Sequence, residues 1–225
     1  LFAVGFSKEK IINTFYSTNK YIFDFEKKIW LTDFNPENYK RPIKLSYDLI
    51  DSKNNKKILS KGEKLNFIIA KKLQEKGLKS ILISNEQIVG KYIANGIKQK
   101  DGEILIGSGF DITEDQLEKI IHQGEKSIDL VNIDPINKGP YLLETLKIDK
   151  NVNKADALND IYKVLRPGEA PSLDIAEEIF NNLYFTKERY DLSEVGRVKL
   201  NSKLNLKISD KKTILTIDDI VAIIQ

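Results

Sequence analysis

Few residue types in this chain could do chemistry, because its 225 residues include no cysteine and one histidine. Disulfides and thiolate metal sites are therefore excluded, and an ordinary zinc site lacks ligands. Two acidic pairs, Asp129 with Asp134 and Asp218 with Asp219, carry oxygen atoms of the kind that bind magnesium or share a proton. Helix caps and solvated faces use such residues more often, and we expect those roles here. We predict no metal site.

The glycine-rich segment and the histidine do not complete a catalytic motif either. The run Gly102–Gly109 lacks the Gly-Lys-Ser/Thr ending that sets a phosphate on a helix N-terminus, and its spacing differs from the dinucleotide fingerprint. We predict a turn there. His122 falls near the end of a predicted helix, where a cation meets the helix dipole favourably. We therefore predict no catalytic residue and do not expect a free-standing small-molecule enzyme.

The arginines are more informative, because there are only four of them against 32 lysines. Three of the four, Arg166, Arg189 and Arg197, fall within the last sixty residues. A guanidinium is a planar fork of donors suited to phosphate, carboxylate or base edges, which lysine does not reproduce. The alternative is a structural ion pair, such as Arg189 with Glu188 or Asp191, and it stays open.

One of these arginines begins a turn motif, Arg166-Pro-Gly-Glu-Ala-Pro171. The motif directly follows a predicted helix over 154–165. Pro167 blocks the continuation of that helix, and Gly168 supplies the backbone freedom of a turn. We expect Arg166 and Glu169 to lie on a stiff, exposed corner between two helices, although an ordinary αα-hairpin has the same pattern.

The elements that must position these residues divide the chain in two. The first part mixes strands and helices: helices at 7–16, 64–76 and 113–123, a hairpin over 20–31, and strands at 42–50, 80–83 and 88–97. Segments 64–84 and 113–132 share the order helix, glycine, strand, which suggests a pseudo-repeat. After a turn-rich stretch that places a boundary near residue 138, helices are predicted at 154–165, 172–183, 193–201 and 216–225. The predicted fold class is α+β.

Charge and size set further limits. The chain carries 36 Lys and Arg against 33 Asp and Glu, and the net charge of +3 is too small for a nucleic-acid signature. The excess is spread thinly over residues 1–150. With 41% hydrophobic residues, no apolar run of membrane length and no signal peptide, the chain is expected to be globular, cytoplasmic and free of the membrane. Leu1 and the absence of methionine suggest a piece of a longer chain.

Several consecutive strings resemble the beta subunit of bacterial DNA-directed RNA polymerase. The strings are Gly139-Pro-Tyr-Leu-Leu-Glu-Thr-Leu146, Ala155-Asp-Ala-Leu-Asn-Asp-Ile-Tyr162, Arg166-Pro-Gly-Glu-Ala-Pro171, Asn182-Leu-Tyr-Phe185 and Arg189-Tyr-Asp-Leu-Ser-Glu-Val-Gly-Arg-Val-Lys-Leu-Asn201. They run in order over about 139–205. Residues 1–138 resemble the same subunit more weakly, through Gly5–Ile12, Ile88–Ala94 and the Gly102-Glu turn.

The resemblance implies a domain division and a function. Residues 1–17 and 139–225 would form a discontinuous, partial beta2 lobe, mainly helical, which is one wall of the DNA cleft. Residues 18–138 would be a lineage-specific insertion domain of strands and helices. By this resemblance Arg166, Glu169 and Arg189, and more weakly Arg197 and Lys199, would contact non-template DNA or sigma factor.

The resemblance also implies partners and what the chain lacks. Its partners would be the alpha, beta' and omega subunits, sigma factor and DNA. The magnesium of the whole enzyme would be bound by another subunit, so the chain would hold no cofactor and would not polymerise RNA alone.

A second hypothesis makes the insertion a docking module for a transcription regulator. It rests on the aromatic residues Tyr16, Tyr21, Phe23, Phe25 and Trp30. The alternative, which we favour, is that these side chains fill the core of the insertion. The exposure of Trp30 distinguishes the two.

Overall fold

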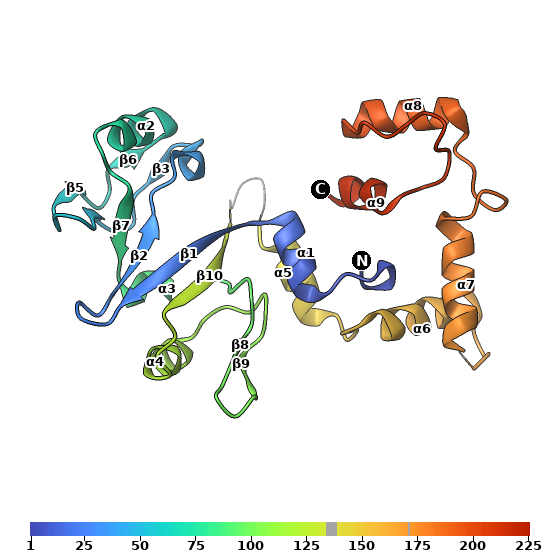
Figure 1. The fold of residues 1–225 in the computed structure, drawn as a ribbon, viewed down its shortest axis with the longest axis horizontal. Coiled ribbons are helices and arrows are strands. Elements are labelled where there is room, and N and C mark those ends of the chain that lie inside the picture. The colour runs from blue at the N-terminus through green and yellow to red at the C-terminus, as the bar shows by residue number, and fades with distance from the viewer. Residues whose placement is uncertain (134–138, 171) are drawn as a thin grey trace. The chain divides into compact units, whose positions relative to one another are not determined.

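The computed structural model describes residues 1–133, 139–170 and 172–225, and it shows an α+β chain as predicted (Figure 1). The chain divides into two compact units. One is Lys8–Ile148, called here the mixed unit. The other joins Leu1–Ser7 to Asp149–Gln225 and is called the helical unit.

The mixed unit contains all of the strands in the described part of the chain. Its helices are α1 (Lys8–Phe15), α2 (Phe67–Glu75), α3 (Asn85–Ile88), α4 (Glu114–His122) and α5 (Tyr141–Ile148), with the short 3-10 helix η2 (Pro36–Tyr39). Its strands are β1 (Ser17–Asp24), β2 (Ile29–Asp33), β3 (Ile43–Lys44), β4 (Leu49–Asp51), β5 (Lys57–Leu59), β6 (Lys64–Leu65), β7 (Ser80–Ile83), β8 (Ile97–Lys98), β9 (Ile104–Ile106) and β10 (Ser127–Asn132).

An antiparallel sheet of six strands, in the order β10-β1-β2-β7-β4-β5, forms the centre of the mixed unit. The hairpin of β1 and β2 was predicted and is confirmed, with Tyr21 opposite Thr32. The two helix–glycine–strand segments, α2 with β7 and α4 with β10, flank this hairpin on its two sides. The pseudo-repeat in the sequence is therefore also a repeat in the sheet. Two smaller ladders, β3 with β6 and β8 with β9, complete the unit.

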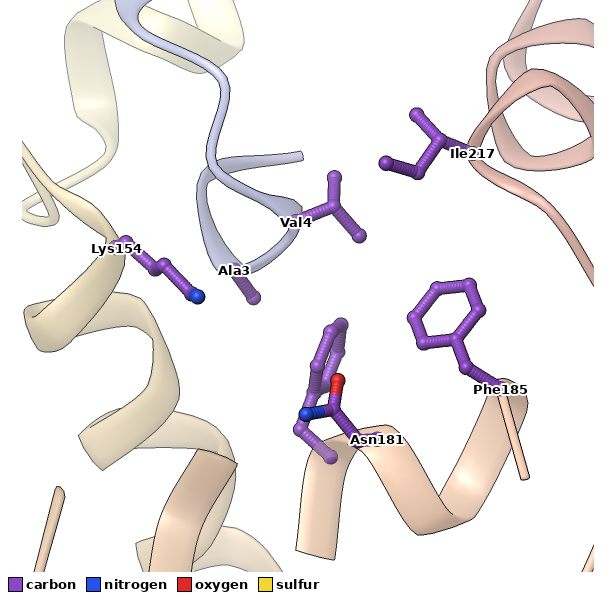
Figure 2. Close-up of a pocket in the computed structure, with 7 residues that line it drawn as sticks. Ala3, Val4, Lys154, Asn181, Phe185 and Ile217 are labelled. Carbon is purple, nitrogen blue, oxygen red and sulfur yellow. The ribbon is translucent and has the colours of Figure 1, made fainter. Parts of the chain in front are cut away.

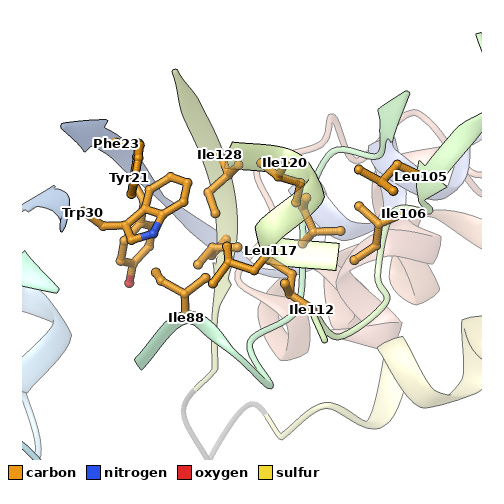
Figure 3. Packing of buried hydrophobic residues seen from close by; sticks show 12 residues of the cluster. Tyr21, Phe23, Trp30, Ile88, Leu105, Ile106, Ile112, Leu117, Ile120 and Ile128 are labelled. Carbon is orange, nitrogen blue, oxygen red and sulfur yellow. The ribbon is translucent and has the colours of Figure 1, made fainter. Parts of the chain in front are cut away.

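One hydrophobic core lies between the β10-β1-β2 end of the sheet and the segments that cover it (Figure 3). Leu117 and Ile120 of α4 pack in the same cluster as Ile128 of β10 and Trp30 of β2. Helix α4 starts where predicted, because Thr113 and Gln116 form a capping box. The second core joins α2 to the other end of the sheet, through Phe34, Leu49, Leu65, Ala70, Leu78 and Ile81.

Four of the five aromatic residues that suggested a docking surface are buried. Trp30 is 0% exposed, and Tyr16, Tyr21 and Phe23 are also buried, whereas Phe25 is 45% exposed. The indole Nε1 of Trp30 donates to Asn85 Oδ1 at 3.0 Å. The core explanation therefore holds for four of the five, and the docking hypothesis loses the observation on which it rested.

Three predicted elements of the mixed unit differ from the structure. The strand predicted over 42–50 is broken into β3 and β4, because β3 pairs with β6 in one sheet and β4 pairs with β5 and β7 in another. The helix predicted from residue 64 begins at Phe67, because Asn66 caps it and the two preceding residues pair with β3. The strand predicted over 88–97 is largely absent, and its residues form isolated bridges at Tyr92 and Ile93 before β8.

Helices α1 and α5 both pack within the mixed unit. The hydroxyl of Tyr16, just after α1, donates to Gly139 O at 2.9 Å, just before α5. Lys147 of α5 is paired with Asp111 at 2.7 Å, and Tyr92 donates to Glu144 at 2.8 Å. The two compact units thus meet between residues 7 and 8 and between residues 148 and 149. The predicted boundaries between lobe and insertion lie between residues 17 and 18 and between residues 138 and 139. The position 138 lies outside the described residues, and the origin of residues 18–138 as an insertion stays a prediction.

The helical unit consists of η1 (Phe2–Val4), α6 (Lys154–Leu165), α7 (Leu173–Tyr184), α8 (Ser193–Leu204) and α9 (Ile217–Ile224). These helices lie within a few residues of their predicted bounds. Helix α6 packs on α7 and on η1, burying Leu158, Tyr162 and Phe180. No helix in the described part of the chain is long and apolar enough to cross a membrane.

Candidate nucleic-acid interface

The turn after α6 has the geometry that its sequence predicts. Arg166 ends α6, and Glu169 N donates to Arg166 O at 3.4 Å, which closes a four-residue turn. Pro167 occupies the second position and Gly168, with φ of +90°, the third, as in a type II turn. A side chain at position 168 would be strained, so glycine is required. Pro171, the last residue of the motif, lies outside the described residues.

Arg166 and Glu169 are brought together on this turn, and both side chains are more than half exposed. Arg166 Nη1 lies 3.5 Å from Glu169 Oε2, and the same carboxylate oxygen accepts from the Tyr162 hydroxyl at 2.7 Å. The hydrogen bond from Tyr162, helped by the charge of Arg166, holds the pKa of Glu169 below its ordinary value. Glu169 is thereby fixed against α6, and the guanidinium of Arg166 keeps donors for a partner.

Arg189 lies beyond the far end of α7, in a turn whose Arg189 N donates to Thr186 O at 3.1 Å. Its side chain is exposed, and no ion pair to it is found among the described residues, so the alternative pairing with Glu188 or Asp191 is not observed. Twelve residues of α7, about 18 Å of helix, separate the two arginine-bearing turns along the chain. The structure therefore presents two exposed arginines at the two ends of one helix.

Arg197 differs from the expectation of a contact residue, because its side chain is 0% exposed. Its Nη1 donates to Asp219 Oδ1 at 2.6 Å and its Nε to Lys212 O at 2.6 Å, and Nη2 donates to Ile214 O. All three nitrogens are thus engaged inside the helical unit. The guanidinium fork holds the segment before α9 against α8 and has no donor nitrogen left facing a partner.

The second carboxylate oxygen of Asp219 completes this buried arrangement. It accepts from Thr216 N at 2.8 Å and from the Thr216 hydroxyl at 2.9 Å, which forms the capping box of α9. Asp219 therefore has the capping role that the sequence predicted for it. Lys199, two residues after Arg197 on α8, is exposed and points away from this interior.

The remaining candidates named from the sequence are His122, the run Gly102–Gly109 and Asp134. His122 lies exposed in the last turn of α4, and the run Gly102–Gly109 contains the short strand β9 and opens no helix. Asp134 lies outside the described residues. Within residues 1–133, 139–170 and 172–225, no three His, Cys, Asp or Glu side chains are grouped to hold a metal ion.

A pocket of about 170 Å³ lies inside the helical unit (Figure 2). Its lining is mainly apolar and comes from η1, α6, α7 and α9: Ala3, Val4, Lys154, Phe180, Asn181, Phe185 and Ile217. Lys154, one of its two polar residues, is paired with Glu177 at 2.5 Å. The pocket is a gap between packed helices, and its lining includes neither Arg166 nor Arg189.

Comparison with known proteins decides the family. A family model described as RNA polymerase Rpb2, domain 2 matches residues 113–225, half of the chain. The chain belongs to this family. The Rpb2 domain 2 match covers the whole helical unit after residue 149, including both arginine-bearing turns, together with α4, β10 and α5 of the mixed unit. The match thus crosses the boundary between the two units.

Bacterial beta subunits are similar over the full chain of this Rpb2 domain 2 member. The DNA-directed RNA polymerase subunit beta of Caulobacter sp. (strain K31) is 38% identical over 100% of the chain, and that of Ehrlichia canis (strain Jake) is 42% identical over 99%. That of Rickettsia conorii (strain ATCC VR-613 / Malish 7) is 40% identical over 99%. The chain spans 16–17% of the length of these relatives. The resemblance to the bacterial beta subunit is confirmed.

Two contacts of the site were missed by reading the sequence. Tyr162 fixes Glu169, and the signal for it is its position four residues before Arg166, on the last turn of α6. Asp219 as the partner of Arg197 has no local signal, because 22 residues separate the two.

Proposed function

We propose that the chain is a non-catalytic part of a bacterial RNA polymerase beta subunit and that its helical unit contributes to one wall of the DNA cleft. The family match and the names of its relatives support the subunit. In this proposal the alpha, beta' and omega subunits are its partners, and another subunit binds the magnesium ion. The chain then acts by holding DNA and sigma factor in place while the reaction occurs elsewhere in the enzyme.

The exposed turn of Arg166 and Glu169 carries the proposal. A guanidinium that is 53% exposed, on a turn stiffened by Pro167 and by the bond from Tyr162 to Glu169, is ready to bind a phosphate or a base edge. Arg189, at the other end of α7, adds a second exposed fork. We propose that both contact the non-template strand and that Glu169 and Lys199 contact sigma factor or DNA beside them. Arg197 is left out, because it is buried.

Affinity for DNA in this proposal comes from the assembled enzyme. Residues 151–225 carry 11 Lys and Arg against 12 Asp and Glu, so the helical unit has little net attraction for a polyanion. The arginines position the strand once it is in the cleft. Their effect should therefore be sought in the lifetime of a promoter complex.

Arg166→Ala and Arg189→Ala, made in the whole polymerase, are expected to shorten the lifetime of the promoter complex. Each lost phosphate contact should make the negative slope of log K against log salt shallower by about 0.7 to 0.9, because fewer counterions are released on binding. Competitor-challenge decay measures the lifetime, and equilibrium titration over a range of salt concentrations measures the slope.

Lys211→Ala is the matched control for these variants, because it removes one exposed positive charge from the same unit at a site outside the proposal. It should leave lifetime and salt slope near the wild-type values. If Arg166→Ala and Arg189→Ala matched this control, the proposed DNA contact would be wrong.

A further inference from the structure

Positive charge is concentrated in one stretch of the mixed unit and is not spread evenly over the first 150 residues. Residues 40–79 carry 12 Lys and Arg against 4 Asp and Glu, a net charge of +8 in a chain whose total is +3. All twelve basic side chains are exposed. This stretch contains β3 to β6, α2 and the chain leading to β7, which gather at one end of the mixed unit in Figure 1. A local charge of this size is a strong electrostatic feature that the whole-chain total hides.

The centre of this charge is the short ladder of β3 and β6. Lys44 and Lys64 lie directly opposite each other in the register, and both are exposed. Like charges placed opposite each other on a sheet are destabilising. The pair therefore has a cost in folding that an anionic partner would remove.

Further groups extend the ladder into a surface. Gly62 lies beside Lys44, whose Cε would be 3.9 Å from a Cβ built there, so the Lys44 side chain runs along the loop that contains Lys61. The Lys61 ammonium lies 6.0 Å from the centroid of the Tyr47 ring, which is 43% exposed. We name the group Lys44, Tyr47, Lys61 and Lys64 the basic ladder surface.

The nearby acids form no ion pair with the lysines of this surface among the described residues, although the charges of Asp48 and Lys61 attract each other. Asp48 accepts from Lys61 N at 2.7 Å and pairs with Lys57 at 3.4 Å, outside the ladder. Glu63 accepts from Ser60 N at 2.5 Å. Both carboxylates thus hold the loop in shape, and no ion pair to the ammonium groups of Lys44, Lys61 or Lys64 is found in the described part of the chain.

We propose that the basic ladder surface binds the phosphate backbone of duplex DNA without reading its sequence. Lysines are point charges suited to phosphates, whereas protein–protein interfaces are depleted in lysine and rich in buried aromatic residues and arginine. Single-stranded nucleic acid is bound by successive stacked bases on several aromatic side chains, and this surface exposes one tyrosine. Duplex DNA is the partner that these features fit.

This inference goes beyond the proposed function and does not depend on it. The arginine-bearing turns belong to the helical unit, and the basic ladder surface belongs to the mixed unit. Substitutions in one unit leave the residues of the other unchanged, so either proposal can fail alone.

The test measures binding of the full 225-residue chain to a labelled mixed-sequence duplex by fluorescence anisotropy, between about 50 and 200 mM salt. The triple variant Lys44→Gln/Lys61→Gln/Lys64→Gln should make the negative slope of log K against log salt shallower by about 2.7, three contacts at about 0.9 each. The charge-matched control Lys98→Gln/Lys119→Gln/Lys126→Gln, which changes exposed lysines elsewhere in the mixed unit, should keep most of the slope.

Lys64→Glu separates binding from folding. It places an acid opposite Lys44, so the midpoint of thermal unfolding should equal or exceed that of the wild-type chain. The affinity for duplex DNA should fall. Equal losses in the two triple variants would show a net-charge effect only and would overturn the proposal. So would no duplex binding by the wild-type chain, tighter binding of a single strand, or binding of a polyglutamate peptide in preference to DNA.

Discussion

Arg197→Ala is expected to destabilise the helical unit by about 3–5 kcal/mol, since it removes one partner of a buried ion pair and leaves the other charged and unpaired. The loss is larger than that of a surface arginine, because the same guanidinium also satisfies the carbonyl groups of Lys212 and Ile214. Without it, Asp219 would keep only the hydrogen bonds of its capping box.

Hydrogen exchange followed by mass spectrometry on the full chain locates this loss. Peptides from α8, α9 and the segment between them should exchange much faster in Arg197→Ala, and those of the six-stranded sheet should not. Trp30 is the only tryptophan, so its fluorescence follows the mixed unit while helical circular dichroism follows both units. Lys199→Ala on the same helix is the control and should change stability by less than about 0.5 kcal/mol. A similar small change for Arg197→Ala would contradict the buried-pair explanation.

The ion pair of Arg197 and Asp219 also makes the stability of the helical unit depend on pH under acidic conditions. Burial raises the pKa of Asp219, but hydrogen bonds from Arg197 and Thr216 outweigh it, and the pKa in the folded chain lies below its ordinary value of 3.8. The stabilisation is therefore present above that ordinary pKa and is lost as pH falls through the lower, folded pKa. In Arg197→Ala most of this acid dependence should disappear from exchange rates in α9.

Trp30→Ala is expected to destabilise the mixed unit by about 3–5 kcal/mol, the range for removing a fully buried large aromatic residue. The indole packs against Phe23, with ring centroids 4.9 Å apart, and lies in the cluster that joins the β1-β2 hairpin to α4. Its removal also leaves Asn85 Oδ1 without its donor. Thermal unfolding by circular dichroism and exchange in β1, β2 and β10 measure the loss.

Two milder variants divide this effect into its parts. Trp30→Phe keeps most of the apolar contact and should lose less than Trp30→Ala, while Asn85→Ala removes the hydrogen bond alone and should cost about 0.5–1.5 kcal/mol. Phe25→Ala is the exposed aromatic control on the same hairpin. If Trp30→Ala cost no more than Phe25→Ala, Trp30 would not be a core residue.

Local signals predicted the parts of the fold that depend on neighbours in sequence. Thr113 with Gln116 fixed the start of α4, and Pro167 with Gly168 fixed the turn that ends α6. The exposure of Arg166 followed from that turn. These features are decided within four or five residues, where capping and backbone restrictions are strong.

The features that sequence reading missed are decided by distant residues. Arg189 and Arg197 lie in similarly polar stretches of sequence. Only Arg197 is buried, because the chain folds back and places Asp219 against it. Residues 43–50 alternate like one strand, but pairing of β3 with β6 and of β4 with β7 divides them between two sheets. The opposition of Lys44 and Lys64 likewise exists only in the register of that ladder.

Photo-crosslinking in a promoter complex tests the proposed role of the Arg166–Glu169 turn most directly. A crosslinking amino acid at Ala170, which is exposed and follows Glu169, leaves Arg166 and its partner in place. In the whole polymerase we expect a crosslink to the non-template strand, and none to DNA from the same group at Lys211. A complex in which the Ala170 position never crosslinks to DNA would contradict the proposed contact.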